Sequence, residues 1–337
     1  MLAALEGRAD DPAAMPNGLH AAVIANAPTN ALVTTLRAAL AALTQAEKDH
    51  LRAAIVDNRE PCEFLLDRTL QLPVVPDAVL PGLEALSTHL YARTAKLVGV
   101  ERACGESIDA HFARFRENAP PGSGNVCCVC GTEYLAQLRS DIDDHEQWRG
   151  PYDHLLAKKH YPLYGVHPKN LLPICGTCNE KAKLAKDLLV KGQNRRLSFS
   201  PWAESASLHE IQISIDDTGM FPSVVINLSS HDANRQEKLD TWDDVYEIKS
   251  RVKGEFKSLA EKVAEHVSAS SEQEFLRDLH ARAAAQIRTC RTTHFNYWRA
   301  RIYRAIEAMD LGSREALRLA IAEAVPQEQE MDELFFN

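Results

Sequence analysis

The sequence has no run of 18 or more apolar residues, so we expect no helix that spans a membrane and no membrane partner. Its first residues, MLAALEGRADDPAAMPNG, carry acids early and lack an apolar segment of signal-peptide length. These two absences predict a cytoplasmic protein. In that compartment the eight cysteines indicate metal ligands or free thiols rather than disulfides.

Positive charge is also scarce in most of the chain. The formal net charge is -9, which argues against a protein that coats nucleic acid with its whole surface. Residues 149–196 differ, because they hold ten Lys and Arg against three Asp and Glu. A charge run by itself is most often a solvated helix face. This one coincides with a cysteine-rich segment, which favours a nucleic-acid interface there.

No repeat of solenoid period is visible, and the 337 residues have room for two or three domains. Apolar periodicity predicts helices in both terminal regions, at 31–57, 60–72, 76–98, 107–118, 234–267, 272–309 and 313–325. Alternating residues at 208–215 and 223–228, joined by a turn at 216–219, predict a β-hairpin. A further helix is expected after Cys178, with Gly192 as its C-terminal stop.

These patterns divide the chain into six segments. We predict an N-terminal helical region (1–119), a Pro- and Gly-rich linker (120–125), a cysteine-rich domain (126–192), a connection with the hairpin (193–232), a C-terminal helical region (233–325) and an acidic tail (326–337).

The C-terminal helices carry seven aromatic residues at helical spacing, which favours a buried stripe over a platform for stacking bases. Nearby arginines keep the second interpretation open. The aromatic residues are Trp242, Tyr246, Phe256, Phe295, Tyr297, Trp298 and Tyr303.

Two C-x-x-C pairs, Cys127/Cys130 and Cys175/Cys178, are the most informative feature of the chain. Each spacing lets two sulfurs reach one ion, and four thiolates make a closed structural zinc site. A redox dithiol is the alternative for one pair, but it does not explain two. A structural zinc contributes on the order of 10 kcal/mol to folding such a unit. The other thiols are interpreted as buried or incidental: Cys62, Cys104, Cys128 and Cys290.

The order C-x-x-C, Asp-His, Asn, C-x-x-C-Asn, Lys resembles the HNH endonucleases, the zinc-braced subset of the ββα-metal nucleases. The matching stretch runs from Cys127 to about Asp187, less than a fifth of the chain. Within it, PYDHLLAKKHYP looks like the strand with the Asp-His pair, and KNLLPICGTCNEKAKLAKD looks like the second strand and the helix start. The resemblance implies a mainly α protein with a small inserted ββα-metal (HNH, treble-clef-like), zinc-braced nuclease domain and a short β-hairpin.

The resemblance also implies roles. Asp153 and Asn179 are expected to hold a catalytic Mg²⁺ or Mn²⁺, since hard oxygen ligands suit these ions. His154 is the expected general base toward the attacking water. Asn170 is expected to orient His154 by a side-chain hydrogen bond. Taken singly, such Asp and Asn residues more often cap turns and helices.

Lys183 is the expected phosphate contact, with Lys181 and Lys186 as rivals. The family name implies a final His where this chain has Asn179, which leaves the preferred ion open. The long acidic stretch before Asp153 resembles an inserted loop, and two histidines near the motif are further candidates to assist a ligand: His160 and His167.

The expected function is therefore metal-dependent hydrolysis of DNA phosphodiester bonds. The region after the motif loosely resembles HNH proteins of bacterial anti-phage defence and restriction systems, which implies a protein partner such as an ATPase. The helical regions and the tail ending in Leu334, Phe335 and Phe336 are expected to dock it. A non-catalytic zinc module that binds nucleic acid or protein, and an RNA-cleaving nuclease, remain as alternatives.

Overall fold

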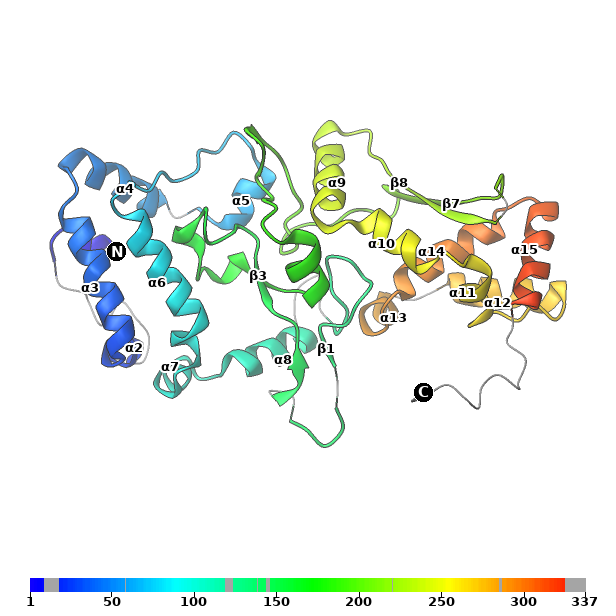
Figure 1. The fold of residues 1–337 in the computed structure, drawn as a ribbon, viewed down its shortest axis with the longest axis horizontal. Coiled ribbons are helices and arrows are strands. Elements are labelled where there is room, and N and C mark those ends of the chain that lie inside the picture. The colour runs from blue at the N-terminus through cyan, green and yellow to red at the C-terminus, as the bar shows by residue number, and fades with distance from the viewer. Residues whose placement is uncertain are drawn as a thin grey trace, which may run out of the picture. The chain divides into compact units, whose positions relative to one another are not determined.

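The computed structural model describes residues 1–8, 18–57, 59–118, 124–137, 139–143, 146–219, 221–284 and 287–324 (Figure 1). Helices make up about 54% of the chain, and the strands of these ranges form small antiparallel pairs, which confirms a mainly α protein. The predicted tail (326–337) and residues 120–123 of the predicted linker lie outside the described residues.

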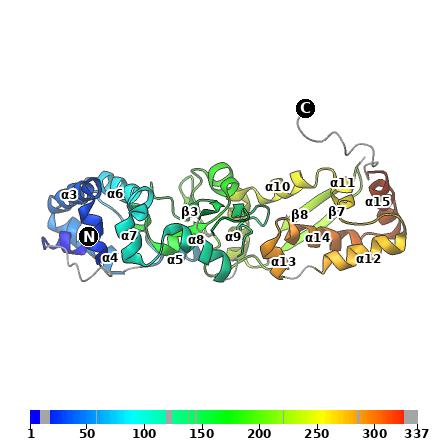
Figure 2. The same cartoon turned by 90° about the horizontal axis from the view of Figure 1, so that it is seen from below.

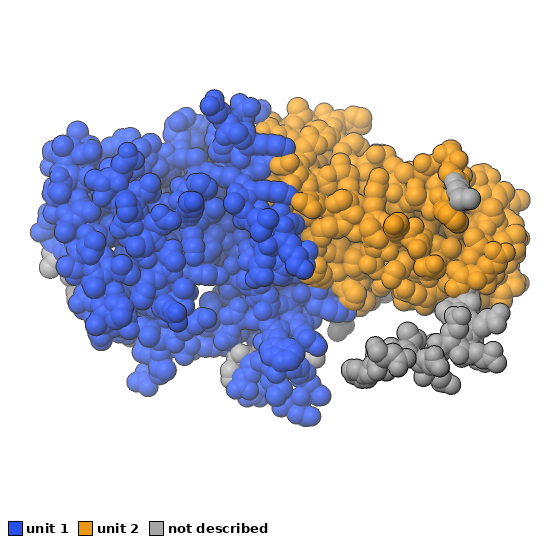
Figure 3. All heavy atoms as spheres, viewed as in Figure 1, with its two compact units in different colours: residues 1–129, 134–205 blue, residues 130–133, 206–337 orange. Residues whose placement is uncertain are grey.

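The chain divides into two compact units (Figure 3). Unit 1 contains residues 1–129 and 134–205, and unit 2 contains residues 130–133 and 206–337. The predicted boundary near residue 120 therefore does not separate two units. The predicted hairpin connection (193–232) is divided between the units at residues 205 and 206.

Unit 1 opens with short helices. They are α1 (Leu2–Leu5), α2 (Leu19–Ala25), α3 (Ala27–Ala41), α4 (Gln45–Asp57), α5 (Pro61–Leu66), α6 (Leu80–Ala92), the 3-10 turn η3 (Thr94–Lys96), α7 (Val98–Cys104) and α8 (Ile108–Asn118). Leucines of α1, α3, α4 and α6 form a common core, with Leu40 and Leu51 almost fully buried.

The single helix predicted at 31–57 is two helices, α3 and α4. Thr44 starts the second: its backbone N–H and hydroxyl both donate to the Glu47 carboxylate, at 2.9 and 2.6 Å, and its hydroxyl oxygen accepts from the Glu47 N–H. This reciprocal arrangement is a capping box, which satisfies the free donors of a helix start. The Thr-x-x-Glu pattern was present in the sequence and marks the break.

The cysteine-rich segment supplies the rest of unit 1. Its elements are β1 (Ala136–Gln137), β2 (Trp148–Arg149), β3 (Tyr152–His154), η5 (Pro162–Tyr164), η6 (Pro168–Asn170), β4 (Leu171–Pro173), η7 (Thr177–Lys183), β5 (Val190–Lys191) and β6 (Asn194–Arg195). Strands β3 and β4 pair antiparallel, with Asp153 opposite Leu172, and η7 follows. The predicted order of two strands and a helix is thus present.

Direct contacts join the N-terminal helices to this segment, which explains why they share a unit. The Tyr91 hydroxyl of α6 donates to the Tyr152 carbonyl oxygen at 2.8 Å. The Arg149 guanidinium of β2 donates to the Asp109 carboxylate of α8 at 2.5 Å.

The helix predicted after Cys178 is shorter than expected. Helix η7 is a π-helix that ends at Lys183, where Leu184 takes a positive φ of 48°. Strands β5 and β6 follow as a hairpin, and Gly192 lies in its turn with φ 63°. Gly192 is therefore a turn residue and not the end of a helix. Glycine tolerates a left-handed backbone in both places, so its preference alone did not distinguish a helix end from a hairpin turn.

Unit 2 contains the predicted hairpin, β7 (Ile211–Asp216) and β8 (Ser223–Leu228), whose pairing is confirmed. Strand β7 packs against α14 (Figure 2). The two longer helices predicted here, 234–267 and 272–309, are each divided into shorter pieces, and Glu247 and Phe295 have left-handed backbones at two of the breaks. The helix predicted at 313–325 is present with nearly the expected bounds, as Leu311–Glu323. The helices of unit 2 that the structure describes are α9 (Ala233–Tyr246), α10 (Ile248–Glu255), α11 (Leu259–Ala264), α12 (Glu272–Ala283), α13 (Ile287–Thr292), α14 (Asn296–Glu307) and α15 (Leu311–Glu323).

The aromatic stripe of unit 2 is largely core, as predicted. Tyr246, Phe256, Trp298 and Tyr303 are each at most 4% exposed, and the remaining three are half-buried. The Trp298 indole N–H donates to the Cys130 carbonyl oxygen at 2.8 Å. A buried indole needs such an acceptor, so this tryptophan is an anchor of its unit rather than a stacking surface.

Candidate metal centre and active site

The four predicted zinc ligands come together. The thiols of Cys127, Cys130, Cys175 and Cys178 are all buried, and their sulfur atoms all lie within 4.8 Å of one another. The Cys127 and Cys178 sulfurs are 4.0 Å apart. A tetrahedral zinc with Zn–S bonds of about 2.3 Å separates its sulfurs by about 3.8 Å. The donor set therefore fits a structural zinc ion.

Hydrogen bonds to the sulfurs support this fit. The Thr132 N–H and hydroxyl donate to the Cys130 sulfur at 3.4 and 3.1 Å. The Cys178 N–H donates to the Cys175 sulfur at 3.4 Å. Donors of this kind stabilise thiolates, the form that binds metal. Gly131, with φ 68°, provides the left-handed step between Cys130 and Thr132.

The other cysteines lie apart from this cluster. Cys62 is buried, Cys128 and Cys290 are half-buried, and Cys104 is exposed. Burial raises the pKa of the Cys62 and Cys290 thiols. Both therefore remain protonated near neutral pH, as expected for thiols that bind no metal.

Asp153 and His154 are adjacent in β3 but face different surroundings. Successive side chains of a strand point to opposite faces of a sheet. The Asp153 carboxylate meets η7, whereas the His154 ring lies edge-on to the Tyr91 ring of α6, with ring centres 4.5 Å apart. The two residues have separate partners, although the sequence pattern groups them.

The Asp153 carboxylate forms a buried ion pair with Lys183. The ammonium donates to both carboxylate oxygens, at 2.8 and 2.7 Å, and also to the His154 carbonyl oxygen. The two side chains are only 6% and 3% exposed. Lys183, the predicted phosphate contact, therefore neutralises the predicted metal ligand. In this arrangement the Lys183 ammonium takes the position at Asp153 that a divalent ion would need.

His154 has the geometry of a base. Its Nε2 atom lies 2.8 Å from the Gly165 carbonyl oxygen. A carbonyl only accepts hydrogen bonds, so Nε2 carries the proton and Nδ1 keeps the lone pair. Burial lowers the pKa of His154 to about 4, and the Lys158 ammonium adds to this effect. The ring is therefore neutral near pH 7 and able to accept a proton at Nδ1.

Gly165 sets the position of that carbonyl. A Cβ atom built on Gly165 would lie 1.8 Å from the Ser87 hydroxyl oxygen of α6, far inside contact distance. A larger residue at this position would require the Ser87 side chain to rotate and the loop after β3 to move slightly away from α6. Helix α6 thus helps to position His154 in two ways. Its Tyr91 ring contacts the His154 ring, and its Ser87 packs against Gly165, whose carbonyl oxygen binds His154 Nε2.

Asn170 is fully buried and acts on the loop rather than on His154. Its side-chain oxygen accepts from the Leu156 N–H at 2.7 Å, and its amide donates to the carbonyl oxygens of Leu156 and Tyr164 at 3.0 and 2.9 Å. The predicted direct bond to His154 is replaced by these contacts. Because Tyr164 precedes Gly165, Asn170 positions His154 indirectly.

Asn179 lies in η7 and is half-buried. Its side chain makes no hydrogen bond to any residue that the structure describes. Residues four apart lie on the same face of a helix, so Asn179 is on the face of η7 that carries Lys183. This places the second predicted metal ligand on the Asp153 side of the helix.

At least half of the basic residues of 149–196 make contacts within the protein. Lys169 pairs with the Glu60 carboxylate at 2.7 Å. Arg149 and Lys183 form the ion pairs described above. The guanidinium groups of Arg195 and Arg196 donate to backbone carbonyl oxygens. The residues 149–196 therefore offer less positive charge to a ligand than their composition indicates.

Lys158 is a second basic residue near His154, besides Lys183. Its ammonium is 5.0 Å from the centre of the Tyr91 ring, the same ring that contacts His154. The two neighbouring histidines of the motif are less suited to bind a metal. His160 is exposed, and the Nδ1 atom of His167 accepts from the Lys169 N–H at 3.3 Å at the start of η6.

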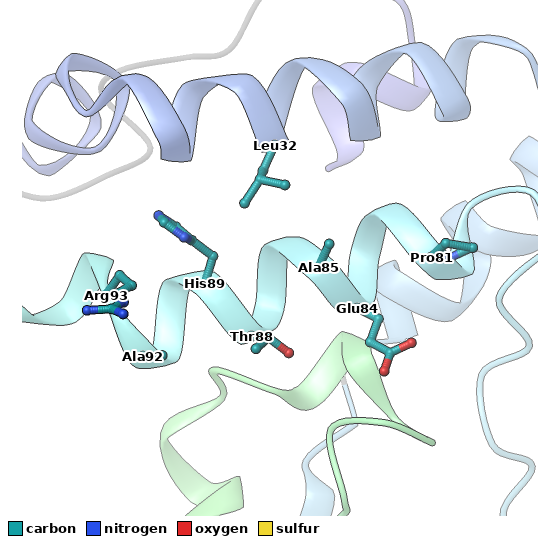
Figure 4. Close-up of a pocket in the computed structure, with 8 residues that line it drawn as sticks. All are labelled: Leu32, Pro81, Glu84, Ala85, Thr88, His89, Ala92 and Arg93. Carbon is teal, nitrogen blue, oxygen red and sulfur yellow. The ribbon is translucent and has the colours of Figure 1, made fainter.

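A surface groove of about 590 Å³ lies along α6 and α3 (Figure 4). None of the predicted site residues lines it, so it belongs to a separate surface. Its lining residues are Leu32, Pro81, Glu84, Ala85, Thr88, His89, Ala92 and Arg93.

Sequence reasoning missed the residues that give His154 its environment: Tyr91, Lys158 and Gly165. Lys158 and Gly165 lie inside the matched stretch, but nothing in the motif distinguishes them. Tyr91 is far away in sequence and carries no signal at all. Thr132 had a weak signal, since Cys-Gly-Thr follows the pattern of a tight turn that points an N–H at a sulfur.

In the part of the chain that the structure describes, every helix is too short or too polar to cross a bilayer. Comparison of the chain with protein-family models, curated proteins and solved structures found no match.

Proposed function

We propose that this protein is a metal-dependent endonuclease of the HNH type that hydrolyses DNA. The observation that supports it most is the state of His154, a neutral imidazole with Nε2 fixed on the Gly165 carbonyl oxygen and Nδ1 left to accept a proton. This base lies on a strand pair followed by a helix, and the four-cysteine cluster includes the start of that helix.

The proposed reaction is in-line attack of water on a phosphodiester. His154 Nδ1 takes a proton from the water, and the carbonyl of Gly165 stabilises the resulting imidazolium through Nε2. A base of low pKa is a weaker acceptor, but the developing negative charge of the phosphate raises its basicity when substrate is bound. Asn170 acts as a positioning residue through the loop 156–164.

Lys158 is the proposed phosphate contact in this arrangement, in which Lys183 is paired with Asp153. Lys158 is half-buried, lies over the Tyr91 ring and acts electrostatically on His154. A fixed ammonium near the base stabilises the charge that develops on the phosphate. Lys159 is its exposed neighbour and provides a matched control.

The proposal includes a protein partner, such as an ATPase of a defence or restriction system. It is supported by charge: the net charge is -9, and at least half of the basic residues of 149–196 are paired within the protein. Phosphate neutralisation supplies most of the affinity for duplex DNA. A chain of this kind needs a second protein to hold it on its substrate.

The test is a plasmid nicking assay with Mg²⁺ or Mn²⁺, comparing wild type, His154→Ala and His231→Ala. His231 is an exposed residue outside the site and serves as the control. We expect nicking by wild type and His231→Ala, and a loss of at least 100-fold in His154→Ala with zinc content unchanged.

One observation favours a second function, a non-catalytic zinc module. The Asp153 carboxylate, the expected metal ligand, is paired with the Lys183 ammonium instead. Under that function His154→Ala and wild type behave alike. Equal nicking, or none by either protein with both metals and with the proteins that co-purify, contradicts the nuclease and supports the module.

A further inference from the structure

The Lys183 ammonium lies where a cation bound to Asp153 would lie. It is held by three oxygen acceptors: both carboxylate oxygens of Asp153 and the carbonyl oxygen of His154. Such an oxygen set is also what Mg²⁺ and Mn²⁺ prefer. The pair is shielded from water, since Lys183 is 2% and Asp153 is 4% exposed.

We infer that the Asp153 carboxylate is a cation-exchange site, in which Lys183 is the resident cation and a divalent ion enters only by displacing it. The inference rests on the proposed function, because that proposal makes Asp153 a metal ligand. In this inference the Asp153 carboxylate pairs with Lys183 in one state of the protein and binds a divalent ion in the other.

Charge repulsion opposes simultaneous occupancy. A divalent ion sits about 2.1 Å from a carboxylate oxygen, and the ammonium already lies 2.7 Å from one oxygen and 2.8 Å from the other. Both cations would then be within a few ångströms of each other in a buried site, where like charges repel far more strongly than in water. We therefore expect one cation to leave before the other binds.

The position of Lys183 in η7 makes its departure feasible. It is the last residue of the helix, and the next residue, Leu184, has a positive φ and is 65% exposed. No further helical turn has to unwind when the Lys183 side chain moves. Wide π turns of this type occur often at functional sites of helices.

A bound phosphate would give Lys183 a second anionic partner. DNA then favours the metal by drawing Lys183 off Asp153, and the metal favours DNA by the same amount, since the coupling is reciprocal. The site would hold its divalent ion only when substrate is present.

The experiment measures Mn²⁺ binding by calorimetry to the full-length, zinc-loaded protein without DNA. We compare wild type with Lys183→Met, which keeps the apolar stem and removes the charge. Lys181→Met is the matched control on the same helix, because Lys181 is exposed. We expect Lys183→Met to bind Mn²⁺ at least tenfold more tightly than the other two. The double variant Asp153→Asn with Lys183→Met should lose this gain.

A second arm uses DNA and the His154→Ala variant, which is expected not to cut it. Mn²⁺ affinity should rise at least tenfold when duplex DNA is added, and DNA should add little in Lys183→Met with His154→Ala. Equal Mn²⁺ affinity of wild type and Lys183→Met without DNA overturns the inference, as does the absence of Mn²⁺ binding from every variant.

Lys183→Met leaves a buried carboxylate unpaired and risks failing to fold, so wild type provides an independent measurement. Amine labelling followed by mass spectrometry reports the exposure of Lys183. Labelling should increase several-fold with Mn²⁺ and DNA, while that of Lys159 stays constant. Unchanged Lys183 labelling under conditions where Mn²⁺ is bound overturns the exchange. Nicking is scored separately, so cleavage that fails while exchange occurs contradicts only the nuclease proposal.

Discussion

Asp153 and His154 are neighbours in the chain, yet their surroundings give them different charge states. Asp153 is charged and fully paired with Lys183, while His154 is kept neutral by its apolar surroundings. The residue types permit both a metal ligand and a base. Which chemistry each one performs depends on residues that approach from α6 and η7.

Replacing Lys158 by Ala tests its proposed contact with a phosphate at the scale of one residue. We expect DNA affinity to fall about tenfold and the slope of log affinity against log salt to decrease by about 1, since one phosphate contact is lost. Lys158→Arg should retain most of the affinity. Fluorescence anisotropy at several salt concentrations measures both quantities.

The control for this test is Lys159→Ala, which removes the same charge from an exposed neighbour. A change as large as that of Lys158→Ala would show that only general charge matters. A loss of stability without a change in salt slope would assign Lys158 to the packing of the Tyr91 ring instead.

At the scale of elements, the loop between β3 and β4 is held in place by one buried side chain. Asn170 closes it through three hydrogen bonds to Leu156 and Tyr164, and Gly165 presents its carbonyl to His154 from the same loop. The position of the base therefore depends on a side chain 16 residues later in the chain.

Asn170→Ala should destabilise unit 1 by about 3 kcal/mol, because it leaves buried backbone groups without partners. Urea unfolding measures this loss of stability. The nicking rate should also fall, because the loop no longer holds the Gly165 carbonyl oxygen against His154. Asn179→Ala is the control, since its side chain bonds to no described residue, and it should cost under about 1 kcal/mol. Equal losses of unfolding free energy in the two variants would contradict the role assigned to Asn170.

At the scale of the whole molecule, zinc is expected to decide whether the site exists. Cys178→Ser, or removal of zinc by a chelator, should unfold the segment 126–183, since the ion contributes on the order of 10 kcal/mol. Elemental analysis should give one zinc per chain, and hydrogen exchange should show the loss of protection there. Cys128→Ser should keep the zinc. Full protection in the metal-free protein would contradict a structural role.

Unit 2 has its own pH-sensitive contact. A hydrogen-bonded pair with Arg235 lowers the pKa of Glu210 from 4.5 to about 2. A lowered folded-state pKa stabilises the protein above the unfolded value, and this contribution is lost as pH falls from 4.5 toward 2. We expect a loss of about 2 kcal/mol across this window, because Arg235 is partly exposed and screened.

Glu210→Gln provides the comparison for that measurement, since other carboxylates also titrate in the window. The difference in unfolding free energy between wild type and Glu210→Gln should be largest above pH 5 and should vanish near pH 2. A difference that does not change with pH would show that the pair contributes nothing through its charge.

The features that depend on residue spacing could be predicted without the structure. The four cysteines meet because two short C-x-x-C steps fix where their sulfurs point, and the hairpin 211–228 forms because its residues alternate. The breaks in the two longer predicted C-terminal helices could not be predicted, since Glu247 and Phe295 take left-handed backbones that their residue types do not favour.

The electrostatics of the candidate site depend instead on packing between distant parts of the chain. Lys183 lies on Asp153, and Tyr91 and Gly165 surround His154, because η7 and α6 bring these residues together from 30 and 63 positions away. A pKa and an ion pair depend on burial and on distances of a few ångströms. Those distances arise from packing between elements, which no local pattern of residues contains.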